Sequence, residues 1–331
     1  AMPLDHYVSQ VHLKNFCSPK LGNLMHAIRK SDLKSFTPDA KSICRTEDGS
    51  TNPYLKEERE IEEFLRGIEP KYNEALAKLR ADKIDKECIY VIAGFIAFVH
   101  ACSPAGMRIQ SEPVKSYVEE IARSADSRGL FPTPPPLLGG QSVTELLLSR
   151  TLSFDIDPKY PQAMGITSIQ LHTAMLGNFE WDILLNPFED SPFFTSDFPL
   201  AIEKTKNIRV LNKIVPLSPS LAIRIRPDLS IDRSCNDFLF PDFRRKIRKL
   251  NRPEVMYINR LITRCAETTI YFRDNHDWIQ NFVKRNSNFR IEPQIQKIPF
   301  ENKTILWVTQ DVCERSCVMP LKTVAPIKSR K

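Results

Sequence analysis

The sequence is short of glycine and of the motifs that are built around it. Only 10 of its 331 residues are glycine, whereas 25 are proline, and an average chain has about 7% glycine. It contains no G-x-G-x-x-G, G-x-x-x-x-G-K-[ST], H-E-x-x-H or G-x-S-x-G segment. Each of these patterns arranges atoms around a dinucleotide, a phosphate chain, a zinc ion or a nucleophilic serine. The usual indications of these four kinds of site, nucleotide cofactors included, are therefore missing.

Paired cysteines and a large charge excess are missing as well. The eight cysteines are scattered, and Cys313 and Cys317 are spaced too widely for a C-x-x-C zinc motif. Several cysteines lie in apolar segments, as reduced thiols do, and no apolar leader opens the chain, so we expect a cytoplasmic protein. With 47 Lys+Arg against 40 Asp+Glu, the net charge of +7 is that of an ordinary globular protein.

One segment is apolar enough to raise the question of a membrane span. Residues 88–107 carry no charged side chain, and about 20 apolar residues suffice to cross a bilayer. The segment nevertheless contains His100, Ser103 and Pro104, and its strictly apolar part ends at Val99. A helix that is apolar on all sides is more often the centre of a helical core, so we expect no membrane contact.

The order of the hydrophobic periodicities predicts an α+β fold. Apolar residues recur at helical spacing in four stretches: 53–80 (interrupted at Gly67 and Pro70), 88–103, 112–126 and 158–176. After Glu180, short alternating runs bounded by Asn, Asp and Pro predict strands, with one helix at 252–266. This order predicts a helical core from the N-terminal half and a small, mainly antiparallel sheet from the C-terminal half, to which an N-terminal strand is added.

We expect a single α+β domain over residues 1–315 and a basic, flexible tail over 316–331. The Pro-rich run 131–141 has the composition of a linker, but the segments on both sides are too apolar to stand apart. We therefore interpret it as an internal loop. Ser142 and Glu145 form the S-x-x-E pattern of a capping box, which predicts a helix start directly after this loop.

The segment 6–16 is dense in functional side chains. If it is extended, alternation places five residues on one face: His6, Val8, Gln10, His12 and Lys14. A face with these side chains can hold a phosphate or move a proton. A solvated edge strand has the same pattern, and taken alone this second interpretation is the more common one.

A second candidate is the segment Thr195-Ser196-Asp197. Two hydroxyls and a carboxylate ahead of Pro199 suit a catalytic or metal-binding strand end. The same composition is typical of an Asx or Ser/Thr turn, and the spacing favours the turn.

The third candidate is the basic run 243–252, which holds six Lys/Arg within nine positions. Such a density suits a phosphate backbone, although a nuclear-localisation signal or a plain basic surface has the same pattern. The predicted nucleic-acid-binding residues are Arg244, Arg245, Lys246, Arg248 and Lys249.

Taken in order, these blocks resemble a largely bacterial family, domain of unknown function 4238. Its members open with a pattern like H-Y-V-P-Q-x-Y-L-[KR]-x-F, which residues 6–16 match with Ser9 in place of proline and His12 in place of the second aromatic. A helix pattern E-x-x-L-x-x-I-E matches 61–69, and T-S-D-x-P matches 195–199. The family has no established activity, so the resemblance implies a fold and a set of polar positions. After the apolar helix the family has an R-x-P-like element, for which this chain offers only Arg108.

Three hypotheses of function follow from these positions. In the first, the protein is a metal-dependent nuclease of the defence or toxin kind: Asp197 and Glu69 hold Mg²⁺ or Mn²⁺ or act as a base, and His6 is the general acid or base. The substrate is then bound by Gln10, Lys14, Ser196 and Arg108, and nucleic acid is the partner.

The second hypothesis is a non-catalytic binding or scaffold module. Here His6, Gln10 and Asp197 form a buried polar network that joins the N-terminal strand to the sheet. The third hypothesis is a small-molecule transferase that uses the same cleft. The sequence predicts no particular oligomeric state.

Overall fold

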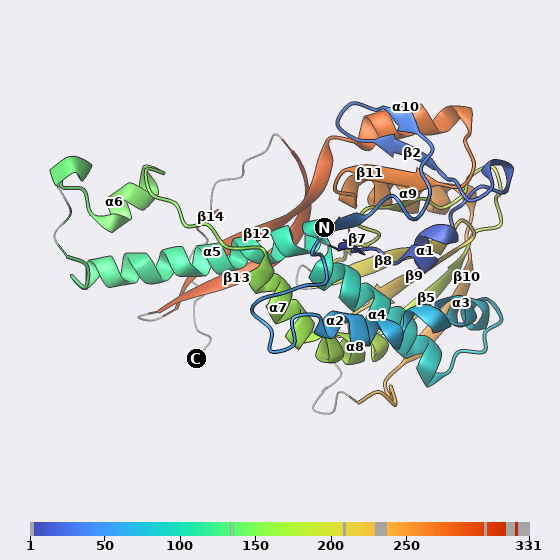
Figure 1. Ribbon diagram of the computed structural model, residues 1–331, viewed down its shortest axis with the longest axis horizontal. Helices are drawn as coiled ribbons and strands as arrows, with labels where there is room; N and C mark the ends of the chain where they lie inside the picture. Colours follow the sequence, from blue (N-terminus) through green and yellow to red (C-terminus); the bar gives the residue numbers. More distant parts are fainter. Residues whose placement is uncertain are drawn as a thin grey trace.

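A computed structural model describes residues 3–132, 134, 136–207, 210–228, 237–300, 303–315 and 322–323. It confirms the α+β class, with the helices mainly in the N-terminal half. Figure 1 shows a body of packed helices and sheets from which an arm extends to one side. The predicted tail lies outside the described residues except for the short strand β14 (Lys322–Thr323).

The centre of the body is α4 (Lys86–Cys102), whose apolar side chains are buried along nearly its whole length. Asp85 begins the helix by accepting a hydrogen bond from the amide of Cys88 at 2.8 Å. Against α4 pack α3 (Tyr72–Arg80) and α8 (Ile169–Gly177). The expected central core helix is thus confirmed.

The predicted helix over 53–80 is divided, as the interruption at Gly67 and Pro70 indicates. It consists of α2 (Glu60–Arg66), the 3-10 turn η2 (Glu69–Lys71) and α3. The helix expected over 158–176 is also divided, into α7 (Lys159–Thr167) and α8. Between them the Ser168 hydroxyl donates to the carbonyl of Met164 at 2.7 Å, and a side chain that bonds the preceding turn in this way weakens helix propagation.

The largest sheet has the strand order β10-β5-β9-β8-β7. Its strands are β5 (Glu180–Leu185), β7 (Ala201–Lys204), β8 (Leu211–Ser218), β9 (Leu221–Arg226) and β10 (Arg244–Lys249). All pairs are antiparallel except β10 with β5. The indole of Trp181 donates to the carbonyl of Leu176 at 2.9 Å and so joins the sheet to α8, while α9 (Arg252–Cys265) packs against β7.

A second sheet, β3-β2-β11-β6, combines the two ends of the chain. It is formed by β2 (His26–Arg29), β3 (Ser35–Phe36), β6 (Thr195–Ser196) and β11 (Thr269–Phe272). The N-terminal strand that joins C-terminal strands is therefore β2. The first strand, β1 (Leu4–His6), pairs with β4 (Arg45–Glu47) instead.

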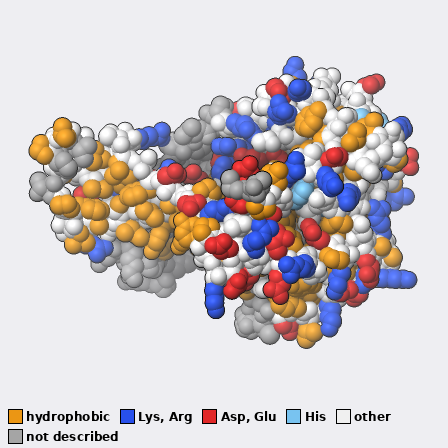
Figure 2. Space-filling view, viewed as in Figure 1, with side chains coloured by type: hydrophobic (Ala, Val, Ile, Leu, Met, Phe, Trp, Pro, Cys, Tyr) orange, Lys and Arg blue, Asp and Glu red, His pale blue; other side chains and the backbone are white. Residues whose placement is uncertain are grey.

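The arm is built from α5 (Pro104–Ser127), α6 (Val143–Leu148) and the hairpin of β12 (Phe289–Phe300) and β13 (Lys303–Glu314), which runs beside α5 (Figure 1). The capping box of Ser142 and Glu145 is confirmed at the start of α6. Figure 2 shows apolar side chains gathered on the arm. Tyr117 of α5 and Leu148 of α6 are 59% and 70% exposed.

Four shorter elements complete the described chain: α1 (Gln10–Lys14), α10 (Asp277–Asn286) and the 3-10 turns η1 (Pro19–Leu21) and η3 (Pro136–Leu138). Among the described helices none is by itself both long and apolar enough to cross a membrane, and α4 and α5 meet at a bend of 62°.

Candidate functional site

The N-terminal motif folds as a three-residue strand and a short helix. β1 ends at His6 and α1 begins at Gln10, so the predicted extended alternation through Lys14 is wrong. The carbonyl of Ser9 accepts a hydrogen bond from the amide of His12 at 3.0 Å, which turns the chain into the helix at the position where an extended strand would continue. As a result His6 and Gln10 remain at the surface, whereas His12 points into the core.

His12 connects α1 to α3 and β6. Its ring nitrogens lie 2.8 Å from the Tyr72 hydroxyl and 2.9 Å from Thr195 Oγ1, and its ring stacks on Phe95 at 4.7 Å. Burial lowers the pKa of His12 to about 3, so the ring is neutral and one nitrogen donates while the other accepts. The contact between the N-terminal motif and the Thr-Ser-Asp segment is therefore a closed polar network.

His6 and Gln10 line an open hollow of about 430 Å³ whose other walls are Asp39, Lys41, Ser42 and Arg45. Gln10 Nε2 lies 3.5 Å from His6 Nδ1, and His6 Nε2 lies 3.2 Å from the carbonyl oxygen of Lys41. Within the described part of the chain neither Lys41 nor Arg45 forms an ion pair. We call this hollow the His6 hollow.

Two charges act on His6 in this hollow. Burial lowers the pKa of His6 and the Arg45 charge lowers it further, while the Lys41 carbonyl and the carboxylate of Glu69 raise it. Glu69 is half-buried at the start of η2. Lys14 is exposed one helical turn after Gln10, on the same side of α1. The fold thus brings His6, Gln10 and Glu69 to one neighbourhood.

Asp197 lies in a different environment, in the core and only 4% exposed. Its Oδ1 accepts a hydrogen bond from the amide of Glu267 at 3.0 Å, and its Oδ2 accepts one from the amide of Thr268 at 2.7 Å. The Thr268 hydroxyl also donates to Oδ2. Burial raises the pKa of Asp197, and the Thr268 donors oppose this rise. Both carboxylate oxygens are therefore engaged inside the protein, where they fix the loop between α9 and β11.

The rest of the Thr-Ser-Asp segment is equally enclosed. Ser196 is 0% exposed, and its Oγ accepts a hydrogen bond from the amide of Phe198 at 3.1 Å. A hydroxyl that bonds the amide two residues later is the Ser/Thr turn that the spacing favours. The Thr195 hydroxyl is hydrogen-bonded to His12, so no hydroxyl of this segment faces the His6 hollow.

A buried lysine near Asp197 is a residue that the sequence analysis missed. Lys30 is 5% exposed, and its Nζ donates to the carbonyls of Ala266 at 2.6 Å and Phe289 at 2.7 Å. Burial lowers the pKa of Lys30 to about 8, and the Asp197 charge opposes this shift. Lys30 stands in an ordinary polar stretch, so no pattern in the sequence marks it.

Cys44 is a second residue that the sequence did not single out. It has φ 54, a left-handed conformation that is uncommon for a residue with a side chain. Its backbone carbonyl accepts from the amide of Tyr7 at 2.8 Å, and its thiol lies 3.7 Å from the Tyr271 hydroxyl. The Asp197 charge raises the pKa of both tyrosines in addition to the larger effect of burial. Cys44, Tyr7, Tyr271 and Asp197 thus form a closed polar layer in the core. This layer lies beside the segment 39–45, which supplies most of the walls of the His6 hollow.

Arg108 forms ion pairs with two acidic residues of the protein. Its guanidinium donates through Nε and Nη2 to the two carboxylate oxygens of Glu267 at 3.1 and 2.9 Å, and through Nη1 to Glu292 at 2.9 Å. A bidentate pair of this geometry orients both partners. Arg108 therefore fastens α5 to β12 and to the same loop that Asp197 holds.

The basic run forms β10, an exposed edge strand. Four of its five predicted nucleic-acid contacts have acidic partners: Arg244 with Asp228, Arg245 with Asp82, Lys246 with Glu180 and Arg248 with Glu254. These acids reduce the positive potential that the sequence alone indicates. Whether the strand binds nucleic acid stays a prediction.

The residues proposed as metal ligands are separated. Among the described residues no group of three or more His, Cys, Asp and Glu side chains is arranged to hold a metal ion. Glu69 lies near the His6 hollow, whereas the Asp197 oxygens accept hydrogen bonds in the core. A metal at Asp197 would have to displace these donors.

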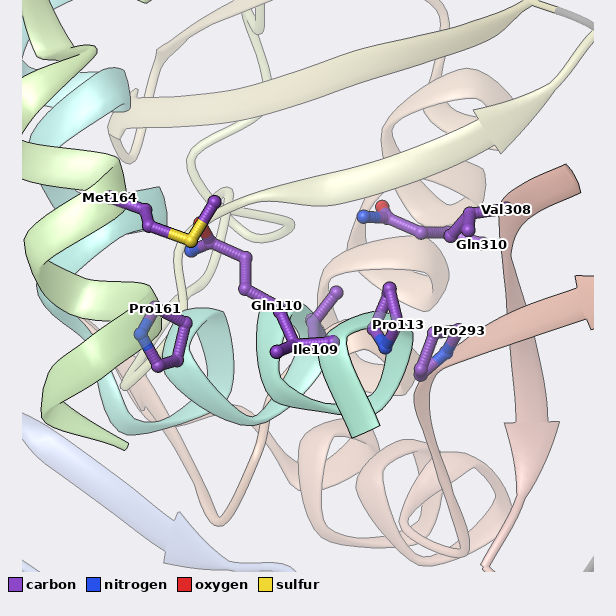
Figure 3. A pocket seen from close by; sticks show the side chains of 9 residues that line it. Ile109, Gln110, Pro113, Pro161, Met164, Pro293, Val308 and Gln310 are labelled. Carbon is purple, nitrogen blue, oxygen red and sulfur yellow. The ribbon is translucent and has the colours of Figure 1, made fainter. Parts of the chain in front are cut away.

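A further hollow, of about 320 Å³, lies between α5, α7 and the β12–β13 hairpin (Figure 3). Prolines 113, 161 and 293 and Met164 give it mostly apolar walls. It contains none of the residues that the sequence analysis proposed for chemistry.

The chain matches a known protein family. The family model described as "Protein of unknown function (DUF4238)" matches residues 5–276, which is most of the chain. No curated protein and no solved structure matches.

Proposed function

The chain belongs to the family described as Protein of unknown function (DUF4238), and on the geometry of the site we propose that it is a nucleic-acid-binding module. The observation that carries this proposal is the composition of the His6 hollow. It is open to solvent, and it places the cations Lys41 and Arg45 beside a histidine and an amide. The same hollow contains one carboxylate, Asp39, whose pKa the Lys41 charge helps to lower.

These side chains suit a phosphate backbone. Lys41 and Arg45 supply positive charge, which releases counterions from nucleic acid when it binds. The Gln10 amide can donate to phosphate oxygens, a contact that positions a strand without reading its sequence. Lys14, one turn further along α1, extends the basic surface next to the hollow.

The environment of Asp197 supports a structural role for that residue. Its oxygens have three protein donors, two of them from Thr268, and such saturation is typical of a group that fixes a fold. The proposal therefore separates two sets of family positions: Asp197 holds the core together, and His6 with Gln10 faces the ligand.

Binding can be tested by the fluorescence anisotropy of a short labelled single-stranded oligonucleotide. We expect Arg45→Gln and Lys41→Gln each to weaken binding about five- to tenfold and to lower the salt dependence by about 0.7 per lost phosphate contact. The matched control is Lys20→Gln, which removes an exposed lysine on η1, outside the hollow. Equal affinities for all variants would contradict the proposal.

Hydrolysis at the same hollow is the second candidate, and the effect of Glu69 on His6 favours it. Burial keeps the pKa of His6 below its ordinary value, but the Glu69 carboxylate opposes this shift, and a carboxylate near an imidazole is an arrangement used for proton transfer. In this version Glu69→Gln retains oligonucleotide binding but loses cleavage in the presence of Mg²⁺ or Mn²⁺. If the unaltered protein leaves the oligonucleotide intact with either ion, only the binding function remains.

A further inference from the structure

Three basic side chains meet in the body, away from the His6 hollow. They are His100 in the last turn of α4, His172 in α8 and Lys213 in β8. The two imidazole rings lie edge to face with centroids 6.4 Å apart, and the Lys213 charge acts on both of them. All three side chains are half-buried, so solvent still reaches the cluster.

No acid in the described part of the chain balances this cluster. Burial is the main cause that lowers the pKa of His100, to about 3, and that of His172, and Lys213 lowers both further. Burial alone lowers the pKa of Lys213. Among the described residues no carboxylate acts on any of the three, and their side chains have no hydrogen bond or ion pair there. When it is protonated, Lys213 is therefore a cation without an acidic partner among the described residues.

The surroundings make such a cation costly. In the sheet, Lys213 stands between Ile202 of β7 and Ile225 of β9. A half-buried charge beside apolar neighbours loses hydration and gains no partner in return. An apolar residue at this position would continue the apolar face of the strand without that cost. The lysine is explained if an anion completes the site.

We propose that His100, His172 and Lys213 bind a small oxyanion of the phosphate class. The ammonium group supplies the opposite charge, and each neutral imidazole offers one N–H to a different oxygen of the anion. With ring centroids 6.4 Å apart, the two rings are close enough for one anion to contact both. The site takes residues from three elements and shares none with the His6 hollow.

The direct test is a titration of the 331-residue chain with inorganic phosphate, observed through the imidazole carbon-bound protons by NMR. Chloride keeps the ionic strength constant, and spectra of His100→Gln and His172→Gln assign the two signals. We expect both signals to move together along one saturable curve. Two independent curves, or no movement, would overturn the proposal.

Lys213→Met and Lys213→Arg supply the matched pair. We expect Lys213→Met to weaken phosphate binding at this site at least tenfold, whereas Lys213→Arg keeps most of it. The Met variant loses a half-buried charge, so it should fold at least as stably as the unaltered protein without phosphate. Phosphate should then raise the thermal midpoint of the unaltered chain but not that of Lys213→Met.

A second control tests whether phosphate bound in the His6 hollow causes these shifts. Phosphate-induced shifts of His100 and His172 should persist in Arg45→Gln, because that residue belongs to the other site. If Arg45→Gln abolishes these shifts, or if Lys213→Met binds phosphate unchanged, the three basic residues are not an anion site.

Discussion

A carboxylate whose oxygens already have protein donors behaves differently from one that faces a ligand. Asp197 has three such donors, and the neighbouring Ser196 and His12 are also fully buried and bonded. By contrast, His6 and Gln10 share a hollow with cations. At the scale of single residues, therefore, the polar positions of the family resemblance separate into a structural set and a ligand-facing set.

Asp197→Asn should destabilise the protein. The amide group of asparagine would face one of the donors of Glu267 or Thr268, so at least one hydrogen bond is lost and a buried donor is left without an acceptor. We expect the free energy of unfolding in urea to fall by about 1–3 kcal/mol, with oligonucleotide affinity of the folded protein unchanged. The nuclease hypothesis predicts the opposite: intact stability and lost activity.

His12 should make stability depend on pH. Its pKa is about 3 in the folded protein and about 6.5 in an unfolded chain, so the unfolded state takes up the proton first as the pH falls. The stabilisation is complete above about pH 6.5 and is lost toward pH 3. Between pH 7 and pH 5 we expect a loss of about 2 kcal/mol from this residue.

Urea unfolding at the two pH values measures this loss. In His12→Gln, which carries no titratable ring, the difference between pH 7 and pH 5 should shrink by the same amount. An undiminished difference would show that other groups cause the pH dependence.

At the scale of elements, the same kind of helix start has different consequences in the body and on the arm. Ser142 begins α6 and Asn251 begins α9, each with a complete capping box. α9 buries Val255 and Ile258, whereas α6 lies on the arm beside α5 (Figure 1). How far the loss of a cap spreads through the protein therefore depends on packing, since the local hydrogen bonds are alike.

Asn251→Ala should lower the free energy of global unfolding by about 1 kcal/mol, the usual value of a lost cap. Ser142→Ala loses the same local bonds, but we expect its effect to appear mainly as faster hydrogen exchange in α6, since the arm opens without the body. Urea unfolding and exchange measured by mass spectrometry distinguish the two. Equal global losses would indicate that α6 unfolds together with the core.

At the scale of the whole molecule, the helices and the large sheet share one buried core. The core cluster includes Leu76 of α3, Ile92 of α4, Trp181 of β5 and Ile258 of α9. Removing one layer would expose the apolar face of the other. The arm adds exposed apolar side chains (Figure 2) and buries only a few, Ala122 of α5 and Leu146 and Leu147 of α6 among them.

A single domain should unfold in one step. We expect the far-UV and near-UV circular dichroism of the full chain to change at the same urea concentration, because secondary structure and side-chain packing depend on the same core. Separate transitions would mean that the Pro-rich run 131–141 divides the chain into independently folding parts.

The helical core was predictable because its signals are local. The apolar run of α4, the interruption at Gly67 and Pro70 and the capping box at Ser142 all act within a few residues. The short strands after Glu180 are also visible, since alternation and turn residues mark them. The Thr-Ser-Asp segment could equally be recognised as a turn from its spacing.

Other features depend on contacts between distant residues. The prediction of an extended strand through residues 6–14 was wrong. The helix there has only five residues, and so short a helix shows too little periodicity in the sequence to exclude a strand. Nothing near Lys30 in the sequence reveals the carbonyls of Ala266 and Phe289 that surround its ammonium group. Likewise, only the packing of α4, α8 and β8 brings two histidines and a lysine together.

The sequence by itself determined the α+β class, the main helices and which residue types could do chemistry, because periodicity and capping are properties of neighbouring residues. The tertiary structure decided which of those residues meet solvent. Asp197 and His6 are both polar family positions, yet one is enclosed and the other is open. Burial is set by what the rest of the chain places on top of a side chain, and that depends on the whole fold.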